Sequence, residues 1–344
     1  MKLTKSQLKS VLTILKPMEM KDQVITMGIV NNILNVSVKK EGMLLKLRSI
    51  KTEEETSPTI SIKKEFLTRV EKQDAEEFDL KINKKTITSK INGVNFSTNI
   101  MDEDMNVDIE EEEVEATKVM LTPEIIDLLG KALFFIAKDT KRPALQGVNF
   151  VLKDKKLTII STDTIKMFIT HVKTDIEGEF NVILRQEMIP VLLAIHETIG
   201  KKAFPVLINE QGLYIISKGI YFKSVLLEGP FPDITKVVEK VENTETTYEL
   251  TFDEKTFKKI KSLENRSSTL VIKKTGKEIL FEMKSEIDLN SFKLEAEDDV
   301  EFEKKMNYTA FTSVLGMVPK VEFKGDFLIF KQNNTIILLM AMRN

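Results

Sequence analysis

The sequence predicts an α+β protein made of three similar domains, each with two helices packed on antiparallel sheets. The chain of 344 residues is too long for one ordinary domain and suits two or three. Short stretches of alternating apolar and polar residues, separated by turn residues, are typical of antiparallel strands. The order of a strand, a helix, several strands, a second helix and more strands occurs three times, which predicts domains over residues 1–115, 116–244 and 245–344.

The first domain opens with an amphipathic helix over residues 5–16, where apolar residues recur at helical spacing until Pro17. A second, shorter helix is predicted over residues 61–73. The turn Asn92-Gly93 joins the last two strands as a hairpin. The domain ends in residues 102–115, which hold nine carboxylates and no basic residue and which we interpret as a linker and an edge strand. The strands are predicted over residues 28–38, 42–49, 78–82, 86–91 and 94–100.

The second and third domains show the same order of predicted helices and strands. A short strand leads to Thr122, a helix N-cap followed by Pro123 at the first helical position. The helices of these two domains are predicted over residues 123–137, 186–199, 253–263 and 308–317. Their strands are predicted over residues 118–121, 148–152, 156–161, 166–172, 180–184, 204–209, 213–217, 221–227, 247–252, 269–273, 278–284, 291–297, 301–305, 321–323, 327–332 and 335–342.

The composition argues against a sequence-specific DNA reader but leaves unspecific phosphate contact open. The formal net charge is −2, and only six of the 51 basic residues are Arg, which reads guanine edges, whereas Lys is a point charge suited to phosphate. The absence of Cys excludes thiolate nucleophiles, disulfides and Cys-based zinc sites. The longest apolar run, residues 336–342, is too short to span a membrane, and no signal peptide is evident, so we expect a cytoplasmic protein.

No motif of a known catalytic or nucleotide site occurs, whether a Walker loop, a dinucleotide-binding glycine motif, a zinc-protease motif or an EF-hand loop. The two histidines, His171 and His196, lie on different predicted elements and are expected to be structural. We therefore expect no enzymatic activity, no cofactor and no metal site. A carboxylate-based hydrolase is a rival hypothesis, but no paired acids stand on a recognisable scaffold.

Lys residues gather on predicted helices, whereas acidic residues gather in loops and strands. Residues 1–18 contain four Lys and no acid, and residues 255–261 contain another four Lys and no acid. Lys on a helix commonly marks only a solvated face. Its recurrence in separate domains also fits a positive surface formed by several helices, with acidic surfaces elsewhere.

Four stretches carry a family resemblance, and they occur in a fixed order along the chain. They are KRPALQGVNF at residues 141–150, STDTIKM at 161–167, LEGPFPDI at 227–234 and LMAMRN at 339–344. Together they resemble the bacterial β-type DNA polymerase sliding clamp, the DNA polymerase III subunit beta family. The resemblance is strongest over residues 118–240 and at the C-terminus.

The resemblance implies a DNA-clamp architecture, a head-to-tail homodimeric ring of clamp domains whose helices line the hole. Such a ring would be a non-catalytic processivity factor that encircles double-stranded DNA without sequence specificity. It would tether DNA polymerase and other proteins that carry short clamp-binding motifs, and an ATP-dependent clamp loader would open it. The rival hypothesis is a clamp-like monomeric module or decoy that binds clamp partners without encircling DNA.

The family's partner site is a hydrophobic cleft between the second and third domains. Two departures from the family predict a different motif preference, because Thr164-Ile165-Lys166 stands where the family often has Gly-His-Arg or Ser-His-Arg, and Ala341 replaces a Pro near the terminus. The matching cleft positions are Arg142, Leu145, Thr162, Thr164, Lys166, Met167, Pro232, Lys236, Val237, Leu338, Leu339, Met340, Met342 and Arg343. The alternative for the three leucines of this set is a place in the core.

The resemblance and the helix charge also imply DNA contacts and a dimer interface. Phe96 and Leu263 match interface hydrophobes of the family, and both could equally belong to the core. The expected DNA contacts are Lys5, Lys9, Lys16, Lys21, Lys63, Lys64, Arg69, Lys138, Lys141, Arg142, Lys255, Lys258 and Lys259.

Overall fold

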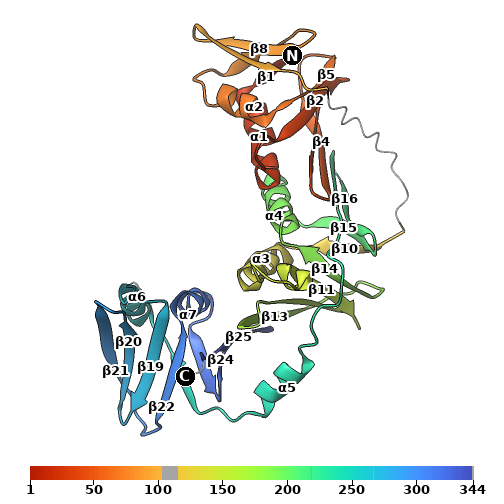
Figure 1. Ribbon diagram of the computed structural model, residues 1–344. Helices are drawn as coiled ribbons and strands as arrows, with labels where there is room; N and C mark the ends of the chain where they lie inside the picture. Colours follow the sequence, from red (N-terminus) through yellow and green to blue (C-terminus); the bar gives the residue numbers. More distant parts are fainter. Residues whose placement is uncertain (103–114, 218, 266, 343–344) are drawn as a thin grey trace. The chain divides into compact units, whose positions relative to one another are not determined.

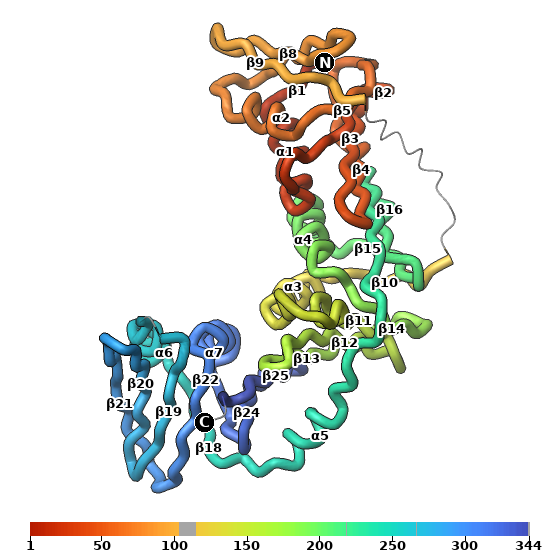
Figure 2. The backbone as a smooth tube through the Cα atoms, in the orientation of Figure 1, coloured from red at the N-terminus to blue at the C-terminus, as the bar shows by residue number. Residues whose placement is uncertain are grey.

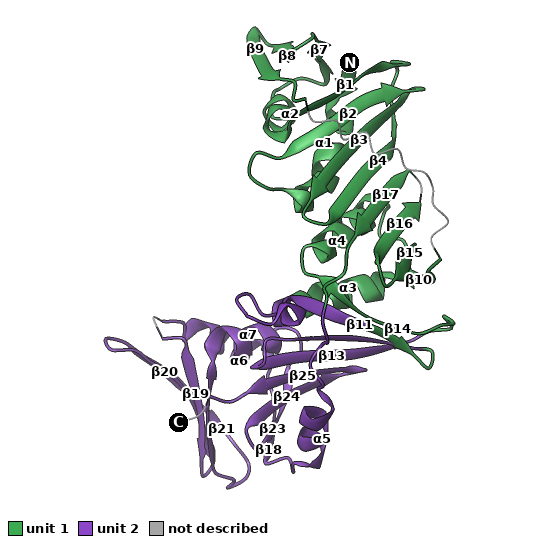
Figure 3. Cartoon of the chain, turned by 45° about the vertical axis from the view of Figure 1, so that its right-hand side comes forward, with its two compact units in different colours: residues 1–133, 151–155, 174–228 green, residues 134–150, 156–173, 229–344 purple. Residues whose placement is uncertain are grey.

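The computed structural model describes residues 1–102, 115–217, 219–265 and 267–342. The described chain forms two compact units (Figure 3), unit 1 with residues 1–133, 151–155 and 174–228 and unit 2 with residues 134–150, 156–173 and 229–344. Short helices pack on antiparallel sheets in both units (Figure 1), so the predicted α+β class is confirmed. The predicted boundaries of three domains stay a prediction. Most of the acidic stretch at residues 102–115 lies outside the described residues.

The main sheet of unit 1 is antiparallel, with the strand order β10-β15-β16-β17-β4-β3-β2-β5. The pairing of β17 with β4 places Phe222 opposite Leu45, and both side chains are fully buried. Burial of side chains of this size stabilises a fold by about 1.5–3 kcal/mol each. The strands are β2 (Val24–Val30), β3 (Ile33–Lys40), β4 (Met43–Lys51), β5 (Ser57–Lys63), β10 (Thr117–Leu121), β15 (Phe204–Asn209), β16 (Gly212–Ser217) and β17 (Ile220–Ser224).

Four helices of unit 1 form a continuous row beside this sheet. Helix α2 contacts α1, α1 contacts α4, and α4 contacts α3, as can be followed in Figure 2. Helix α1 begins with a capping box, in which Thr4 Oγ1 accepts a hydrogen bond from Gln7 N and Gln7 Oε1 accepts one from Thr4 N. The helices are α1 (Lys5–Leu15), α2 (Lys64–Glu71), α3 (Pro123–Ala132) and α4 (Met188–Thr198).

Unit 1 also contains two small sheets and three short elements outside its main sheet. Strand β1 (Lys2–Thr4) pairs with β6 (Glu77–Asp79). A three-stranded sheet has the order β7-β8-β9, so β9 is an edge strand. Its strands are β7 (Lys81–Ile82), β8 (Thr86–Ile91) and β9 (Val94–Asn99). The other elements are the 3-10 helix η1 (Lys16–Met18), the strand β14 (Phe180–Arg185) and the 3-10 helix η2 (Leu133–Phe135), which runs into unit 2.

Unit 2 contains the sheet order β11-β12-β13-β25-β24-β23-β18 and a four-stranded sheet with the order β21-β20-β19-β22. Its helices are η3 (Pro143–Gln146), α5 (Thr235–Asn243), α6 (Glu254–Ser262) and α7 (Tyr308–Leu315). Its strands are β11 (Gly147–Lys153), β12 (Lys156–Thr162), β13 (Lys166–Lys173), β18 (Tyr248–Thr251), β19 (Thr269–Thr275), β20 (Glu278–Lys284), β21 (Leu289–Glu295), β22 (Phe302–Asn307), β23 (Lys320–Lys324), β24 (Phe327–Gln332) and β25 (Thr335–Met340).

The two faces of the sheet that contains β13, β25 and β24 pack against different side chains. On one face, Phe168 of β13 packs 5.4 Å from Phe135, measured between ring centroids, and Phe330 of β24 lies 6.1 Å from Phe311 of α7. The opposite face carries an apolar cluster that packs against α5 and the segment before it. The members of this cluster are Ile160, Met167, Ile169, Val241, Phe327, Ile329 and Leu338, with Phe231, Ile234, Val237, Val238 and Ile336 packed against them.

The structure differs from the predicted elements at several places, including residues 28–38, 61–73 and 235–243. The strand predicted over residues 28–38 is two strands, β2 and β3, because Asn31 and Asn32 have φ values of 51° and 60° and form a tight turn. The helix predicted over residues 61–73 begins only at Lys64, since β5 extends to Lys63. Helix α5 was not predicted, because its apolar residues are few and follow a Pro-rich stretch that indicates a loop.

Candidate functional site

A solvent-open pocket with a volume of about 170 Å³ lies in unit 2, on the face of the sheet that carries this apolar cluster. Eight of its thirteen lining residues are apolar, so it offers a surface that favours apolar side chains over charged ones. The lining residues are Arg142, Thr162, Thr164, Ile165, Lys166, Met167, Pro232, Asp233, Ile234, Val237, Phe327, Leu338 and Met340.

Strands β13, β25 and β24 form the floor of the pocket. Met167 stands opposite Leu338 in the antiparallel register, and Phe327 stands opposite Met340. Because directly paired residues share a face of a sheet and alternate residues point to opposite faces, this register puts these four side chains on one face. Leu339, between Leu338 and Met340, points to the other face and is buried there. A register shift by one residue would therefore remove the floor.

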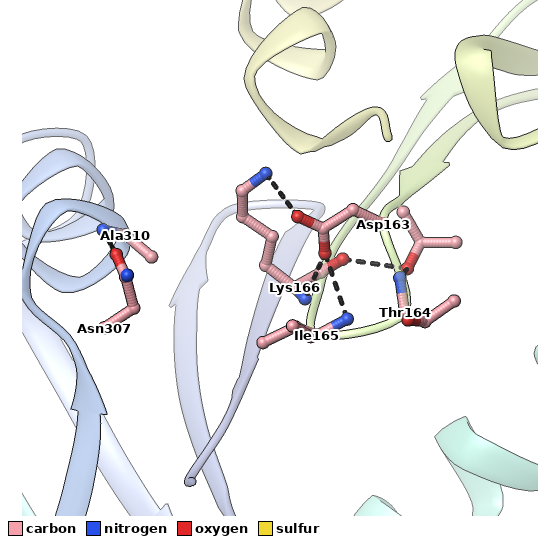
Figure 4. A network of polar contacts seen from close by, with 7 residues as sticks. Asp163, Thr164, Ile165, Lys166, Asn307 and Ala310 are labelled. Atoms are coloured by element: carbon pink, nitrogen blue, oxygen red, sulfur yellow. Dashed lines mark hydrogen bonds and ion pairs between the residues drawn. The ribbon is translucent and has the colours of Figure 1, made fainter. Parts of the chain in front are cut away.

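The β12–β13 turn, residues 163–166, is drawn in Figure 4, and its residues Thr164, Ile165 and Lys166 line one wall of the pocket. Asp163 organises it, because its Oδ1 accepts hydrogen bonds from Ile165 N at 3.0 Å and Lys166 N at 2.8 Å. Thr164 N donates to Thr162 Oγ1, and Thr164 has a φ of 78°, which is unusual for a β-branched residue. Such backbone strain costs about 1–3 kcal/mol and persists only where surrounding contacts hold it. The turn leaves Ile165 58% exposed at the pocket.

The charge of Lys166 is engaged within the protein. Its ammonium forms an ion pair with Asp163 Oδ2 at 2.8 Å and lies 4.8 Å from the centre of the Phe134 ring. The Lys166 side chain is only 13% exposed. Arg142 also lines the pocket, but it is exposed at the rim. Between these two cations, Arg142 is therefore the one placed to meet an anion from solution.

The opposite wall is the segment that leads into α5. Pro232, Asp233 and Ile234 line the pocket there, followed by Val237 in the first turn of the helix. Hydrogen bonds from the side chain and the backbone N–H of Thr235 hold the pKa of the Asp233 carboxyl below its usual range. Asp233 is therefore a carboxylate at neutral pH, and it adds an exposed negative charge to the pocket lining.

The structure brings together nine of the residues predicted for the cleft. These are Arg142, Thr162, Thr164, Lys166, Met167, Pro232, Val237, Leu338 and Met340.

The other predicted cleft residues do not line the pocket in the described part of the chain. Leu145 and Leu339 are 2% and 3% exposed and belong to the core, which was the alternative considered for them. Lys236 is exposed on α5, one residue before Val237, and is not among the residues that line the pocket. Met342 is 48% exposed, and its N–H donates to Lys305 O. Arg343 lies outside the described residues.

Four lining residues are not among the residues predicted for the cleft. Ile165, Asp233 and Ile234 stand within the stretches that carried the resemblance, so the motifs contained a signal for them. Phe327 begins β24 in a region without any motif. Only its pairing with Met340 brings it to the pocket, and that pairing is a property of the folded sheet.

The predicted DNA contacts have different environments. Lys64 is 5% exposed and its ammonium is paired with Glu19 at 2.9 Å, so its assignment as a DNA contact is wrong for the folded chain. Lys5 donates to Gln73 O at 2.9 Å, and Lys63 is paired with Asp22 at 2.7 Å. The remaining predicted contacts are exposed and are Lys9, Lys16, Lys21, Arg69, Lys138, Lys141, Arg142, Lys255, Lys258 and Lys259.

The two predicted interface residues also differ from each other. Phe96 is half-buried on the edge strand β9. Leu263 is 4% exposed at the end of α6 and belongs to the core of unit 2. On the edge strand β21 of the same unit, Leu289 is 60% exposed and Phe292 is half-buried against Phe281, with a ring-centroid distance of 4.9 Å.

The described residues contain no group of three or more His, Asp or Glu side chains that could hold a metal ion. His171 is half-buried on β13, where its Nδ1 lies 3.0 Å from Thr158 Oγ1, and burial lowers the pKa of the His171 imidazole. His196 is buried on α4 beside the ring of Phe204. Among the helices that the structure describes, none is long and apolar enough to cross a membrane.

The architecture is that of a DNA clamp, and it matches solved clamps over its whole length. The DNA polymerase III beta subunit of Thermotoga maritima superposes with a TM-score of 0.84 at 13% identity, covering 100% of this chain and 99% of that one. The sliding clamp of Bacillus subtilis superposes with a TM-score of 0.82 at 17% identity, covering 100% and 98%. A beta clamp of Helicobacter pylori bound to a DNA ligase peptide superposes with a TM-score of 0.79 at 16% identity, covering 99% of each chain.

Sequence similarity to bacterial sliding clamps covers part of the chain. Residues 120–233 match the family described as DNA polymerase III beta subunit, central domain. The beta sliding clamp of Bacillus subtilis is 26% identical over 121 residues, 35% of this chain and 32% of that protein. The beta sliding clamp of Halalkalibacterium halodurans is 25% identical over 217 residues, 61% of this chain and 52% of that protein. The matched regions thus span about a third and about half of these relatives, and the predicted resemblance to bacterial sliding clamps is confirmed.

Proposed function

We propose that this protein is a DNA polymerase processivity factor, a sliding clamp that encircles double-stranded DNA and binds partner proteins through the unit 2 pocket. The observation that carries the proposal is the assembly of nine predicted cleft residues around one apolar pocket. These residues come from distant parts of the chain, and a core alone does not require them to meet at an open cavity. The ligase-peptide complex of a clamp with the same fold supports a short peptide as the occupant.

The proposed peptide partners are a DNA polymerase and other replication or repair proteins with short clamp-binding motifs. An apolar side chain of the motif would enter the pocket over Met167 and Leu338, and burial of such a side chain contributes about 1.5–3 kcal/mol. Met340 and Met167 have flexible, polarisable thioethers, which suit a surface that accommodates more than one motif. The exposed Arg142 at the rim would pair with an acidic group of the partner.

Double-stranded DNA is the second proposed partner. The helix row of unit 1 presents Lys9 and Arg69 to solvent, and α6 of unit 2 presents Lys255, Lys258 and Lys259. Exposed Lys contacts phosphate without reading bases, and such contacts are loose enough to permit sliding. A closed ring keeps DNA by topology, so the formal net charge of −2 is compatible with this role.

A homodimer that joins the edge of unit 1 in one copy to the edge of unit 2 in a second copy is the proposed assembly. Both edge strands, β9 and β21, offer free backbone groups for pairing and carry a half-buried Phe, Phe96 and Phe292. Their charges are complementary. Residues 80–101 contain four Lys and no acid, whereas residues 286–301 contain seven acids and one Lys. Opposite charges at two different edges favour head-to-tail association over pairing of like edges.

The remaining features of the proposal follow from these partners. The protein would act without catalysing a reaction, since tethering requires only binding. Opening of the ring would need an ATP-dependent clamp loader, because the chain contains no nucleotide-binding motif. A protein that binds chromosomal DNA and its polymerase in a bacterium would work in the cytoplasm.

The proposal is tested by retention on circular DNA. The protein is loaded onto a nicked plasmid with a purified bacterial clamp loader and ATP, the complex is isolated by gel filtration, and half of it is linearised. We expect retention on the circle and rapid loss from the linear molecule, because a ring slides off free ends. Equal retention on both forms would contradict topological binding. A strict monomer in sedimentation, with intact peptide binding, would favour the clamp-like decoy instead.

A further inference from the structure

The methionines of this chain are its main oxidisable side chains, since the sequence has 15 Met and no Cys. In the described part of the chain, four methionines are exposed. They are Met20 at 43%, Met120 at 41%, Met340 at 39% and Met342 at 48%. Of these four, Met340 alone lines the pocket of unit 2. Met167 also lines the pocket, but it is 8% exposed and therefore shielded from dissolved oxidants.

The backbone holds the Met340 side chain toward the pocket. Met340 N donates to Ile165 O at 2.8 Å, which ties the end of β25 to the turn at residues 163–166. The next residue, Ala341, donates its N–H to Asp326 O at 2.8 Å. Cross-strand pairing with Phe327 fixes the face on which Met340 lies. A chemical change at the sulfur would therefore be presented to a ligand in the pocket.

Oxidation would change the chemistry of this surface. The sulfur lone pair of Met340 attacks one oxygen of hydrogen peroxide, the O–O bond breaks, and the other oxygen leaves as water after proton transfer. The sulfur loses two electrons to the peroxide and becomes a sulfoxide, which is polar and accepts hydrogen bonds. Its neighbours in the pocket include Ile165, Phe327 and Leu338, which offer it no donor from their side chains.

Resting on the peptide-binding role proposed above, we propose that Met340 is an oxidant-sensitive modification site, at which peroxide converts the thioether to a sulfoxide and weakens binding of an apolar peptide motif. The effect is reciprocal, because a bound peptide covers the sulfur and slows its oxidation. It is also reversible, because methionine sulfoxide reductases restore the thioether. The pocket would thus release its partners under oxidative conditions without loss of the fold.

The test measures the affinity of a fluorescein-labelled DNA ligase peptide by anisotropy before and after peroxide treatment, with oxidation at each Met quantified by mass spectrometry. The variants are Met340→Leu, which keeps volume and apolarity, and Met342→Leu as the matched control on a Met outside the pocket. We expect peroxide to weaken peptide binding by the wild type and by Met342→Leu by roughly 5- to 20-fold, each relative to its own untreated affinity. Peroxide should leave the affinity of Met340→Leu the same as that of the untreated variant. Treatment with the reductases should restore the affinity of the two oxidised proteins.

Two results would overturn the proposal. One is unchanged affinity of the wild type when mass spectrometry shows complete oxidation of Met340. The other is an equal loss of affinity in Met340→Leu, which would place the effect at another methionine. Failure of the untreated wild type to bind the peptide is a different outcome, because it would count against the peptide-binding function itself.

Discussion

The turn at residues 163–166 should be sensitive to substitution of Asp163, because the carboxylate of this residue makes three of its contacts. Asp163 Oδ1 accepts two backbone N–H groups, and Asp163 Oδ2 pairs with the Lys166 ammonium at 2.8 Å. Substitution Asp163→Asn keeps an oxygen for the two backbone donors but removes the charge that pairs with Lys166. Substitution Asp163→Ala removes all three contacts. The pair of variants therefore separates the ion pair from the hydrogen bonds that shape the turn.

The magnitudes follow from the environment of each contact. The side chains of Lys166 and Asp163 are 13% and 23% exposed, so their pairing is only partly screened by solvent. Loss of one charge-assisted contact at such a site costs about 1.5–3 kcal/mol, whereas each backbone hydrogen bond contributes about 0.5–1.5 kcal/mol. We therefore expect Asp163→Asn to lower the free energy of unfolding by about 1–2 kcal/mol, because the Lys166 ammonium also contacts the Phe134 ring. Asp163→Ala should cost about 3–4 kcal/mol.

Urea unfolding and peptide anisotropy measure the two consequences. Asp163→Ala should also weaken peptide binding by roughly tenfold or more, since Thr164, with its strained φ of 78°, relaxes when the turn loses its anchor. Asp163→Asn should weaken binding much less, because the turn keeps its shape. If both variants unfold at the wild-type urea concentration and bind peptide normally, the turn does not depend on Asp163 and the reasoning fails.

Three further predictions concern the pocket, a buried lysine of unit 2 and the assembly. Val237→Asp should abolish peptide binding, because it places a charge in the apolar lining of the pocket. Lys236→Asp, at the neighbouring exposed position, should leave peptide binding intact. Equal losses of affinity in the two variants, measured by anisotropy, would contradict the assignment of Val237 to the pocket wall. The hydrogen bond from the buried Lys274 holds the pKa of the Asp298 carboxyl below its usual range. The pair therefore stabilises the folded protein fully at pH values above the unfolded pKa of Asp298, about 3.9. This stabilisation is lost as the pH falls through the lower pKa of Asp298 in the folded protein. Lys274→Met should remove this step from the acid-unfolding curve followed by circular dichroism, and a curve of unchanged shape would argue against the linkage. Lys85→Glu should weaken the dimer, as measured by sedimentation equilibrium, because it reverses a charge near the proposed interface. The wild-type dimer should also be weaker in about 1 M salt than in about 0.05 M salt. Association that does not depend on salt would contradict an interface formed by opposite charges at the two edges.

Most elements could be predicted because their signals are local. The helix after Thr122 depends on a cap and a Pro at the first position, and the β8–β9 hairpin depends on Asn92-Gly93, whose φ values of 49° and 82° fit a tight turn. Helix α5 could not be predicted from the sequence, because its apolar face consists of only three Val residues. The helix is stabilised by packing of these residues on the sheet, which exists only in the folded protein.

The pocket was predictable only where a motif marked it. The four resembling stretches contained ten of the thirteen lining residues, and Leu338 stands next to the last stretch, but the stretches did not distinguish lining residues from core residues. Leu338 and Leu339 are adjacent and chemically identical, yet Leu338 lines the pocket and Leu339 is buried on the other face. The strand register decides between them, and a motif match does not contain that information.

The sequence by itself determined the α+β class, the positions of most helices and strands, the separation of Lys-rich from acidic segments, and the resemblance to sliding clamps. These depend on periodicity and on short-range order, which neighbouring residues establish. Only the tertiary structure decided which Lys residues are free. Lys64 and Lys166 are withdrawn into ion pairs, whereas Arg142 remains exposed at the pocket rim. The physical reason is that an ionic partner, like the pairing of Met167 with Leu338, depends on which segments pack together after folding.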